Sequence, residues 1–197
     1  MKLVVGLGNP GRRYAETRHN VGFRIVERFG VEHAIALDES CFQGRFGRRC
    51  IAGDLDVGVL EPLTYMNRSG DAVAEALGSL PVEDVSRDLI VALDDVDLPF
   101  GRLRLRPRGG TAGHKGLSDI AERVGHNDFA RLRFGVGRPE GALDTADYVL
   151  QPFAPAEATE LIERLATAAA ALHAALVDGV TAAMNRYNSD GAAPTDA

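Results

Sequence analysis

The sequence predicts a single-domain α/β fold built around a mixed β-sheet. Its 197 residues match the length of one domain with a sizeable core. Apolar strand-like runs alternate with amphipathic helix-like segments, which is typical of layered α/β proteins. Two strand-like segments flank the turn Gly53-Asp54, and this hairpin adds antiparallel pairing to the sheet.

The first half of the chain begins with an apolar strand that ends in a glycine-rich loop. Leu3, Val4 and Val5 form the apolar run, and the glycines and proline that follow cannot continue a regular element. Val21, Ile25, Val26 and Phe29 then share one helical face. The expected elements are a strand at residues 2–6, a helix from about residue 20, strands at 41–52 and 55–61, and a helix at 69–78.

The second half repeats the alternation. Residues 101–106 alternate arginine with leucine, which predicts a strand with one wet face. The expected elements are strands at residues 88–93, 101–106 and 131–137, a helix at 117–125 after the glycine-rich loop 109–116, and a long helix at 155–184. We place the domain at residues 1–188 and predict a disordered tail at 189–197.

Composition narrows the class of protein. Charged residues are 25% of the chain, no run of eighteen apolar residues occurs, and no signal-peptide core is present, so we expect a cytoplasmic protein without membrane contact. Cys41 and Cys50 fit no disulfide framework or zinc spacing. The net charge of −6 argues against indiscriminate nucleic-acid binding. Arginines nevertheless cluster, which indicates one anion-binding face: Arg102, Arg104, Arg106, Arg108, Arg131, Arg133 and Arg138.

The glycines of the first loop raise one alternative. Gly6, Gly8 and Gly11 match the G-x-G-x-x-G pattern of dinucleotide-binding proteins, which would make the chain a nucleotide-dependent oxidoreductase. In that fold the helix starts within the glycine loop. Here Pro10 lies inside the pattern and the helical periodicity starts only near Asn20, so this alternative is disfavoured.

Polar side chains recur where the apolar segments end. Ligand sites in open α/β sheets lie at the carboxyl ends of the strands. We therefore expect the following side chains to converge: Asn9, His19, Asn67, Asp94 and His114. Each alone has a structural explanation, as a turn residue, helix cap or surface side chain. Their joint occurrence favours a site.

Four stretches together resemble the bacterial peptidyl-tRNA hydrolases. They are VVGLGNPGRRYAETRHNVGF, PLTYMNRSG, ALDDVDLPFGRLRLR and GGTAGHKGLSDI, and the resemblance spans about residues 1–187. It implies a monomeric α/β fold with a twisted mixed sheet flanked by helices. It also implies hydrolysis of the ester that joins a peptide to the 3′ end of tRNA, which recycles the tRNA, with neither metal nor cofactor.

The resemblance assigns roles to individual residues. His19 matches the catalytic histidine, and a neutral imidazole can take a proton from water near pH 7. Asp94 matches the carboxylate that orients this imidazole. Asn9 matches the residue associated with selecting N-blocked substrates. Further substrate- or tRNA-contacting positions are matched by Tyr14, Tyr65 and Asn67.

Phosphate binding is implied for three arginines, Arg104, Arg106 and Arg133, because guanidinium groups suit phosphate oxygens. His114 matches a family histidine with a substrate-binding or loop-ordering role. Lys115 departs from the family, which usually has asparagine there. If Lys115 points into the cleft, we expect it to bind a phosphate or the ester carbonyl. We expect tRNA binding then to depend more strongly on salt.

A second alternative is a protein of the same fold that has no hydrolytic activity. Relatives of this fold act in intron splicing, so an RNA-binding protein without hydrolytic activity fits the same pattern. Lys115 keeps this alternative open, whereas the presence of His19 together with Asp94, Asn9 and Asn67 argues against it.

Overall fold

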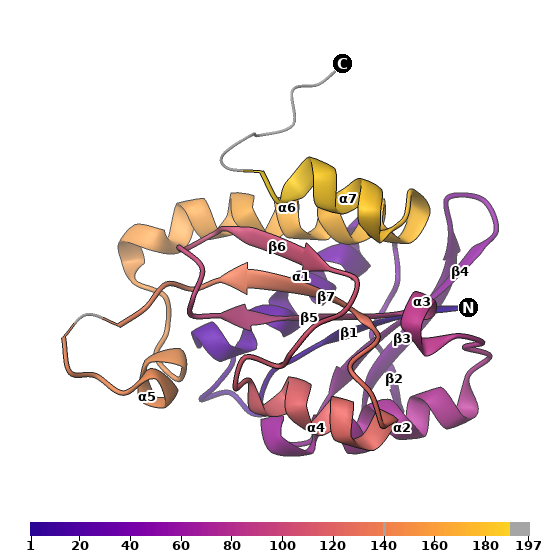
Figure 1. Ribbon diagram of the computed structural model, residues 1–197, viewed down its shortest axis with the longest axis horizontal. Helices are drawn as coiled ribbons and strands as arrows, with labels where there is room; N and C mark the ends of the chain where they lie inside the picture. The colour runs from indigo at the N-terminus through magenta and orange to yellow at the C-terminus, as the bar shows by residue number, and fades with distance from the viewer. Residues whose placement is uncertain (140, 190–197) are drawn as a thin grey trace.

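The computed structural model, which describes residues 1–139 and 141–189, confirms the mixed sheet that the sequence predicts (Figure 1). The sheet has seven strands, one more than expected. Their order is β2-β3-β4-β1-β5-β7-β6. β4, β1, β5 and β7 run parallel, whereas β2, β3 and β6 pair antiparallel with their neighbours. The strands are β1 (Lys2–Gly6), β2 (Glu39–Cys41), β3 (Gly44–Ile51), β4 (Leu55–Pro62), β5 (Leu89–Asp95), β6 (Leu103–Arg106) and β7 (Ala130–Gly135).

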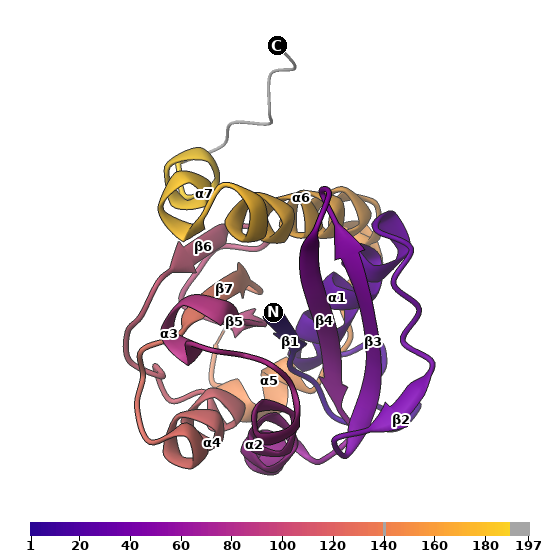
Figure 2. The same cartoon turned by 90° about the vertical axis from the view of Figure 1, so that its right-hand side faces the viewer.

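Helices cover both faces of the sheet. α1, α6 and α7 lie on one face, and α2 and α4 lie on the other (Figures 1 and 2). The alternation of side chains along each strand supplies both cores, so that Val4 of β1 packs toward α1 while Leu3 and Val5 pack toward α2 and α4. The helices are α1 (Val21–Glu32), α2 (Ser69–Ser79), α3 (Val85–Asp88), α4 (Lys115–Val124), α5 (Thr145–Val149), α6 (Ala158–Val177) and α7 (Val180–Tyr187), with short 3-10 turns η1 (Arg18–Asn20), η2 (Met66–Arg68) and η3 (Pro155–Glu157).

Two expected elements are each divided in the structure. Phe42 and Gln43 both have positive φ and form a hairpin turn, so the strand expected at residues 41–52 becomes β2 and β3. Gly179, with φ of 91°, separates α6 from α7 within the single helix expected at 155–184. The short helices α3 and α5 were not expected. Residues 190–197 of the expected tail lie outside the described residues.

The glycines of the first loop serve packing. A Cβ added at Gly6 would lie 2.5 Å from the carbonyl oxygen of Gly22, and one at Gly8 would lie 2.7 Å from the ring of Phe23. Both contacts are with α1, which therefore packs closely on the end of β1. Residues 11–17 form turns, and no helix starts within the glycine loop. The dinucleotide-binding interpretation is therefore wrong, because it requires a helix that starts within the glycine loop. None of the described helices is long and apolar enough to cross a bilayer.

A buried carboxylate lies near the end of β4, outside the lining of the cleft discussed below. The side chain of Glu61 is 1% exposed, and its Oε2 accepts a hydrogen bond from Nη1 of Arg45 at 3.0 Å. Burial, reinforced by the charge of Glu27 and opposed by that of Arg45, raises the pKa of Glu61 to about 8. In the unfolded chain the pKa of Glu61 is near 4.5. Between pH 4.5 and about 8, Glu61 is therefore protonated in the folded chain and ionised in the unfolded chain.

This proton makes stability fall as pH rises from about 4.5 through about 8. Glu61→Gln keeps the shape of the protonated side chain without its titration. At pH 8.5 we expect the free energy of unfolding of the variant to exceed that of wild type by about 1–3 kcal/mol. This difference should shrink toward pH 5. Denaturant unfolding across this pH range measures it.

Asp56→Asn is the matched control on the same strand. The hydrogen bond from Arg48 lowers the pKa of Asp56, so removing this carboxylate should destabilise the protein at pH 8.5. A Glu61→Gln variant that is less stable than wild type at every pH would contradict the assignment.

Candidate active site

A cleft of about 800 Å³ opens where the parallel strands β1, β5 and β7 end. The chain leaving β1, the end of β5, η2 and the start of α4 all contribute to its lining. Eight of the sequence-predicted site residues line it, namely Asn9, His19, Tyr65, Asn67, Asp94, His114, Lys115 and Arg133. Convergence at the carboxyl ends of the strands explains why residues far apart in the chain meet here.

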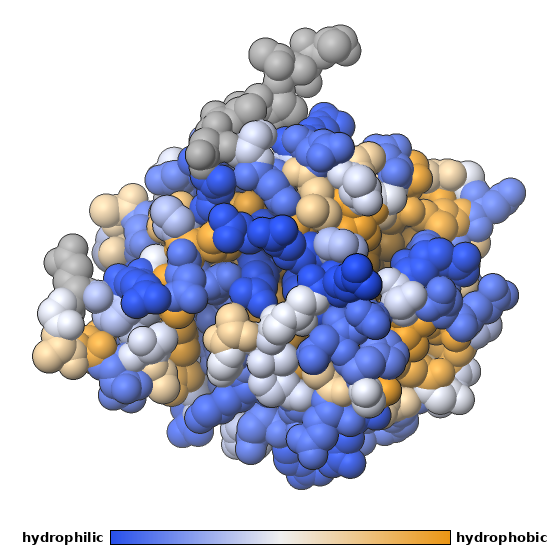
Figure 3. Space-filling view, viewed as in Figure 1, coloured by the Kyte–Doolittle hydropathy of each residue, from blue (hydrophilic) through white to orange (hydrophobic). Residues whose placement is uncertain are grey.

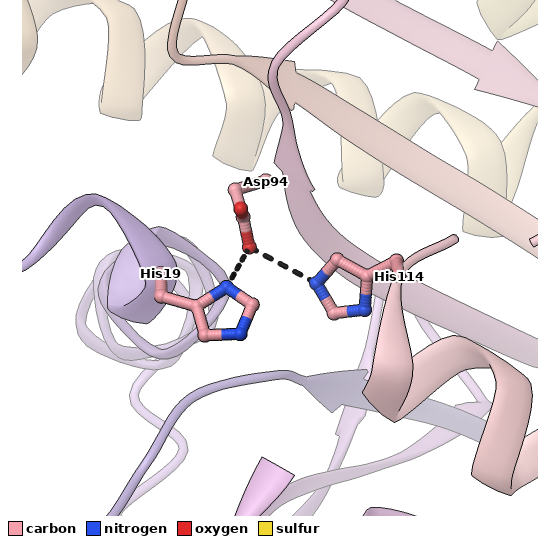
Figure 4. A group of neighbouring side chains, drawn as sticks. All are labelled: His19, Asp94 and His114. Atoms are coloured by element: carbon pink, nitrogen blue, oxygen red, sulfur yellow. Dashed lines mark hydrogen bonds and ion pairs between the residues drawn. The ribbon is translucent and has the colours of Figure 1, made fainter. Parts of the chain in front are cut away.

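Asp94 and His19 form a hydrogen-bonded pair at the bottom of this cleft. Asp94 is buried near the end of β5, and its Oδ1 lies 2.8 Å from Nδ1 of His19 in η1 (Figure 4). Burial opposes ionisation of Asp94, but the imidazoles of His19 and His114 outweigh it and hold its pKa well below the usual range. Because an ionised carboxylate only accepts hydrogen bonds, a neutral His19 ring carries its proton on Nδ1. Nε2 therefore keeps a lone pair that can accept a proton.

His114 is the second partner of the same carboxylate oxygen. Its Nε2 lies 3.0 Å from Oδ1 of Asp94, and its Nδ1 accepts a hydrogen bond from the backbone N–H of Leu117 at 3.3 Å (Figure 4). His114 therefore carries its proton on Nε2 and caps α4, which begins at Lys115, two residues before the expected start. Both ring nitrogens of His114 are thus engaged, so neither offers a free lone pair to a proton.

The same three side chains are a candidate metal-ligand group, since their ligand atoms lie within 4.8 Å of one another. A metal-bound imidazole normally donates its other N–H to an acceptor. Nδ1 of His114 instead faces the N–H of Leu117, which is a donor. Metal binding through Nε2 of His114 would break the cap of α4. The donor set therefore does not fit a resident metal ion.

Asn9 is held by three hydrogen bonds that leave one polar atom for a ligand. Its Oδ1 accepts from the N–H of Met66 at 2.9 Å. Its backbone N–H and C=O bond the side-chain amide of Asn20, at 2.8 and 2.9 Å. The remaining donor is the amide nitrogen of Asn9, in a residue that lines the cleft. Asn20 is buried and positions Asn9, a role that its place beside His19 did not reveal.

The rim of the cleft carries exposed groups. Tyr65 is 56% exposed, and Asn67 in η2 is also exposed. Lys115 occupies the first turn of α4 and makes no side-chain hydrogen bond or ion pair within the described part of the chain. Tyr14 lies outside the cleft, in the turns before η1, where the guanidinium of Arg13 stacks 4.5 Å from its ring centre.

The arginines of β6 and β7 share one face of the sheet. Arg104 pairs with Arg133, and Arg106 with Arg131, across the two strands. Arg133 is the one of these that lines the cleft; it bonds Asp95 at 3.2 Å and the carbonyl of Gly110 at 2.7 Å. The space-filling view shows strongly hydrophilic surface where β6 and β7 lie in Figure 1 (Figure 3).

Arg131 is fully buried, which the alternating pattern did not predict. Its guanidinium donates to backbone carbonyls of four residues and so fixes the start of the glycine-rich loop: Gly109, Gly110, Asn127 and Phe129. Sequence reasoning also missed the wall that α5 contributes to the cleft, which includes Ala146, Val149 and Leu150. The short α5 carries no periodic signal, and the one residue pattern that marks its start is the N-cap Asp144, whose side chain accepts a hydrogen bond from the N–H of Ala146.

Comparison with known proteins agrees with this geometry. Residues 3–195 match the family model described as peptidyl-tRNA hydrolase. The peptidyl-tRNA hydrolase of Chloroflexus aggregans is 47% identical over 188 residues, covering 95% of this chain and 99% of the relative. That of Symbiobacterium thermophilum is 42% identical over 189 residues, with 95% and 99% covered.

A solved structure supports the same assignment. The crystal structure of the peptidyl-tRNA hydrolase from Acinetobacter baumannii superposes with a TM-score of 0.83 at 35% identity, covering 96% of this chain and 95% of that one. Both the sequence and the arrangement of the elements are therefore shared along nearly the whole chain. The chain belongs to the peptidyl-tRNA hydrolase family of enzymes.

Proposed function

We propose that this protein hydrolyses the ester between tRNA and a peptide or N-blocked amino acid, with His19 as general base and Asp94 as its orienting partner. The observation that carries the proposal is the His19–Asp94 hydrogen bond of 2.8 Å in the cleft, which leaves Nε2 of His19 as the proton acceptor. Family membership supplies the substrate class.

The reaction follows from these groups. Nε2 of His19 takes a proton from water as the water oxygen attacks the ester carbonyl, and Asp94 stabilises the imidazolium that forms. The amide nitrogen of Asn9 is a donor for the developing oxyanion or for the peptide backbone. Collapse of the intermediate breaks the bond between the acyl carbon and the ribose oxygen, and the proton held by His19 passes to this leaving oxygen, which becomes the ribose hydroxyl.

The tRNA part of the substrate requires cationic groups. Arg104 and Arg106 make no side-chain hydrogen bond or ion pair among the described residues and are therefore available to phosphates. Arg133 is engaged with Asp95 and Gly110, so its contribution to phosphate binding is combined with holding the glycine-rich loop. His114 and the rim residues Tyr65 and Asn67 complete the proposed acceptor-end site, with Tyr14 as a contact outside the cleft.

Removing the imidazole should abolish the chemistry. We expect His19→Ala to lower kcat by about 10²–10⁴-fold on N-acetyl-aminoacyl-tRNA, with or without chelator, because the general base is lost. Wild type should leave the same aminoacyl-tRNA with a free amine intact. Release of the acetylated amino acid from labelled tRNA measures both. The exposed His126, outside the cleft lining, supplies the control His126→Ala. A His19→Ala rate close to wild type would refute the general-base role.

Asn20→Ala tests whether Asn9 must be held. Two buried hydrogen bonds are lost, so we expect kcat to fall by about tenfold while the His19–Asp94 pair remains. Asn188 is a matched control, because its amide bonds the N–H and C=O of Leu105 in the same way outside the cleft lining. Asn188→Ala should lower the melting temperature and leave kcat unchanged. Equal kcat values for the two variants would show that Asn20 is structural only.

Lys115→Asn should make tRNA binding less dependent on salt. If the ammonium contacts a phosphate, the slope of log K against log salt concentration should decrease by about one unit. Filter binding at several salt concentrations measures the slope. Lys2→Asn is the control, since Lys2 is the one other lysine and pairs with Asp88 outside the cleft. An unchanged slope in Lys115→Asn would exclude Lys115 as a phosphate contact.

A further inference from the structure

Arg18, the residue before His19, is a buried cation attached to a distant segment of the chain. Its side chain is 8% exposed. Nη2 donates to Oε2 of Glu157 at 2.8 Å, and Nη1 donates to the carbonyl oxygen of Pro152. The guanidinium also lies over two aromatic rings, 4.5 Å from the centre of Tyr148 and 5.1 Å from that of Phe153. All side-chain partners of Arg18 among the described residues thus lie within residues 148–157.

The backbone reinforces this attachment. The N–H of Arg18 donates to the carbonyl of Gln151 at 3.0 Å, and Thr17 forms an isolated antiparallel bridge with Pro152. Burying a guanidinium is costly unless it is paired and hydrogen-bonded, and the carboxylate of Glu157 supplies the opposite charge. The two residues before His19 are therefore fastened to the segment that follows α5.

That segment continues directly from one wall of the cleft. The wall consists of α5 and Leu150, and it presents Ala146, Val149 and Leu150 to the cleft. In Figure 1, α5 lies apart from both helical layers, beside the ends of β5 and β7. α5 contacts η1. It is also attached to the end of the sheet by the hydroxyl of Tyr148, which donates a hydrogen bond to the carbonyl of Val136 at 2.8 Å. Val149 also anchors the wall in the hydrophobic core. Arg18 adds the polar attachment, through Tyr148 of α5 and through the residues that follow it.

We propose that Arg18 is a positioning residue that fixes the α5 wall at a set distance from His19, and that this wall binds the acyl part of the substrate. The inference rests on the proposed function. The wall is apolar at the three residues named above, whereas the arginines of β6 and β7 suit phosphates. The acyl chain therefore contacts the apolar α5 side of the cleft, whereas the tRNA contacts the cationic side formed by β6 and β7.

The test compares Arg18→Met with Arg18→Lys in the full-length protein. Methionine fills similar space without charge or hydrogen bonds, so the wall loses its attachment. We expect Arg18→Met to raise KM for N-acetyl-aminoacyl-tRNA by about tenfold while kcat stays within about twofold, because His19 remains paired with Asp94. The pH profile of kcat should be unchanged. Arg18→Lys retains the charge, so its KM should lie between those of wild type and Arg18→Met.

Hydrogen exchange supplies a readout that needs no activity. In Arg18→Met, amides of residues 144–153 should exchange faster while those of β5 remain protected. Arg24→Met is the matched control. The guanidinium of Arg24 lies 5.9 Å from the ring centre of Phe153 and pairs with the exposed Glu16, but it makes no hydrogen bond to the wall segment among the described residues. It should leave both KM and exchange at residues 144–153 unchanged.

The outcomes separate the two proposals. Unchanged KM and unchanged exchange at residues 144–153 in Arg18→Met would overturn the positioning role, as would faster exchange throughout the sheet with kcat and KM altered together. If Arg18→Met does not fold, the same comparison is decided by Arg18→Lys. If wild type releases no acetylated amino acid, the proposed function fails, whereas local exchange still decides whether Arg18 holds the wall.

Discussion

One buried carboxylate oxygen determines how the cleft is built. Oδ1 of Asp94 accepts hydrogen bonds from both His19 and His114, and these bonds offset the cost of burying its charge. The two imidazoles come from different layers, one from the turn before α1 and the other from the start of α4. The carboxylate therefore ties the helices of both faces to the end of β5. It also sets both tautomers, so that one histidine keeps a free lone pair while the other caps a helix.

The sequence predicted this convergence for a topological reason. β1 and β5 were expected from their apolar runs, and the structure places both in the parallel part of the sheet. Asn9 and Asp94 follow or end these strands, so parallel pairing brings them to one edge. Four motifs at the spacing of a known family also predicted the family to which the chain belongs. The split of the expected strand at Phe42 was missed, since neither Phe42 nor Gln43 is a typical residue for positive φ.

The contacts that support the site were not predictable in the same way. Asn20 and Arg131 are buried polar side chains whose hydrogen-bond partners are backbone groups, and the buried Arg18 also has one such partner, the carbonyl of Pro152. A backbone carbonyl carries no residue-type signal, so nothing in the sequence of residues 109, 127 or 152 marks it as a partner. The alternation of arginine with apolar residues in β7 did predict a shared face for Arg131 and Arg133. Which arginine is enclosed depends on how the glycine-rich loop folds over that face, and this is decided by tertiary structure.

Asn188 has a consequence for how the molecule behaves among its own copies. β6 is the last strand of the sheet, and a free strand edge is a template for pairing with another chain. The amide of Asn188 occupies both the N–H and the C=O of Leu105 in the middle of this strand, much as a neighbouring peptide group would. A single side chain at the end of α7 thus imitates an eighth strand at one register position. Protection from intermolecular β-pairing at this edge is then a property of the C-terminal helix rather than of β6 itself.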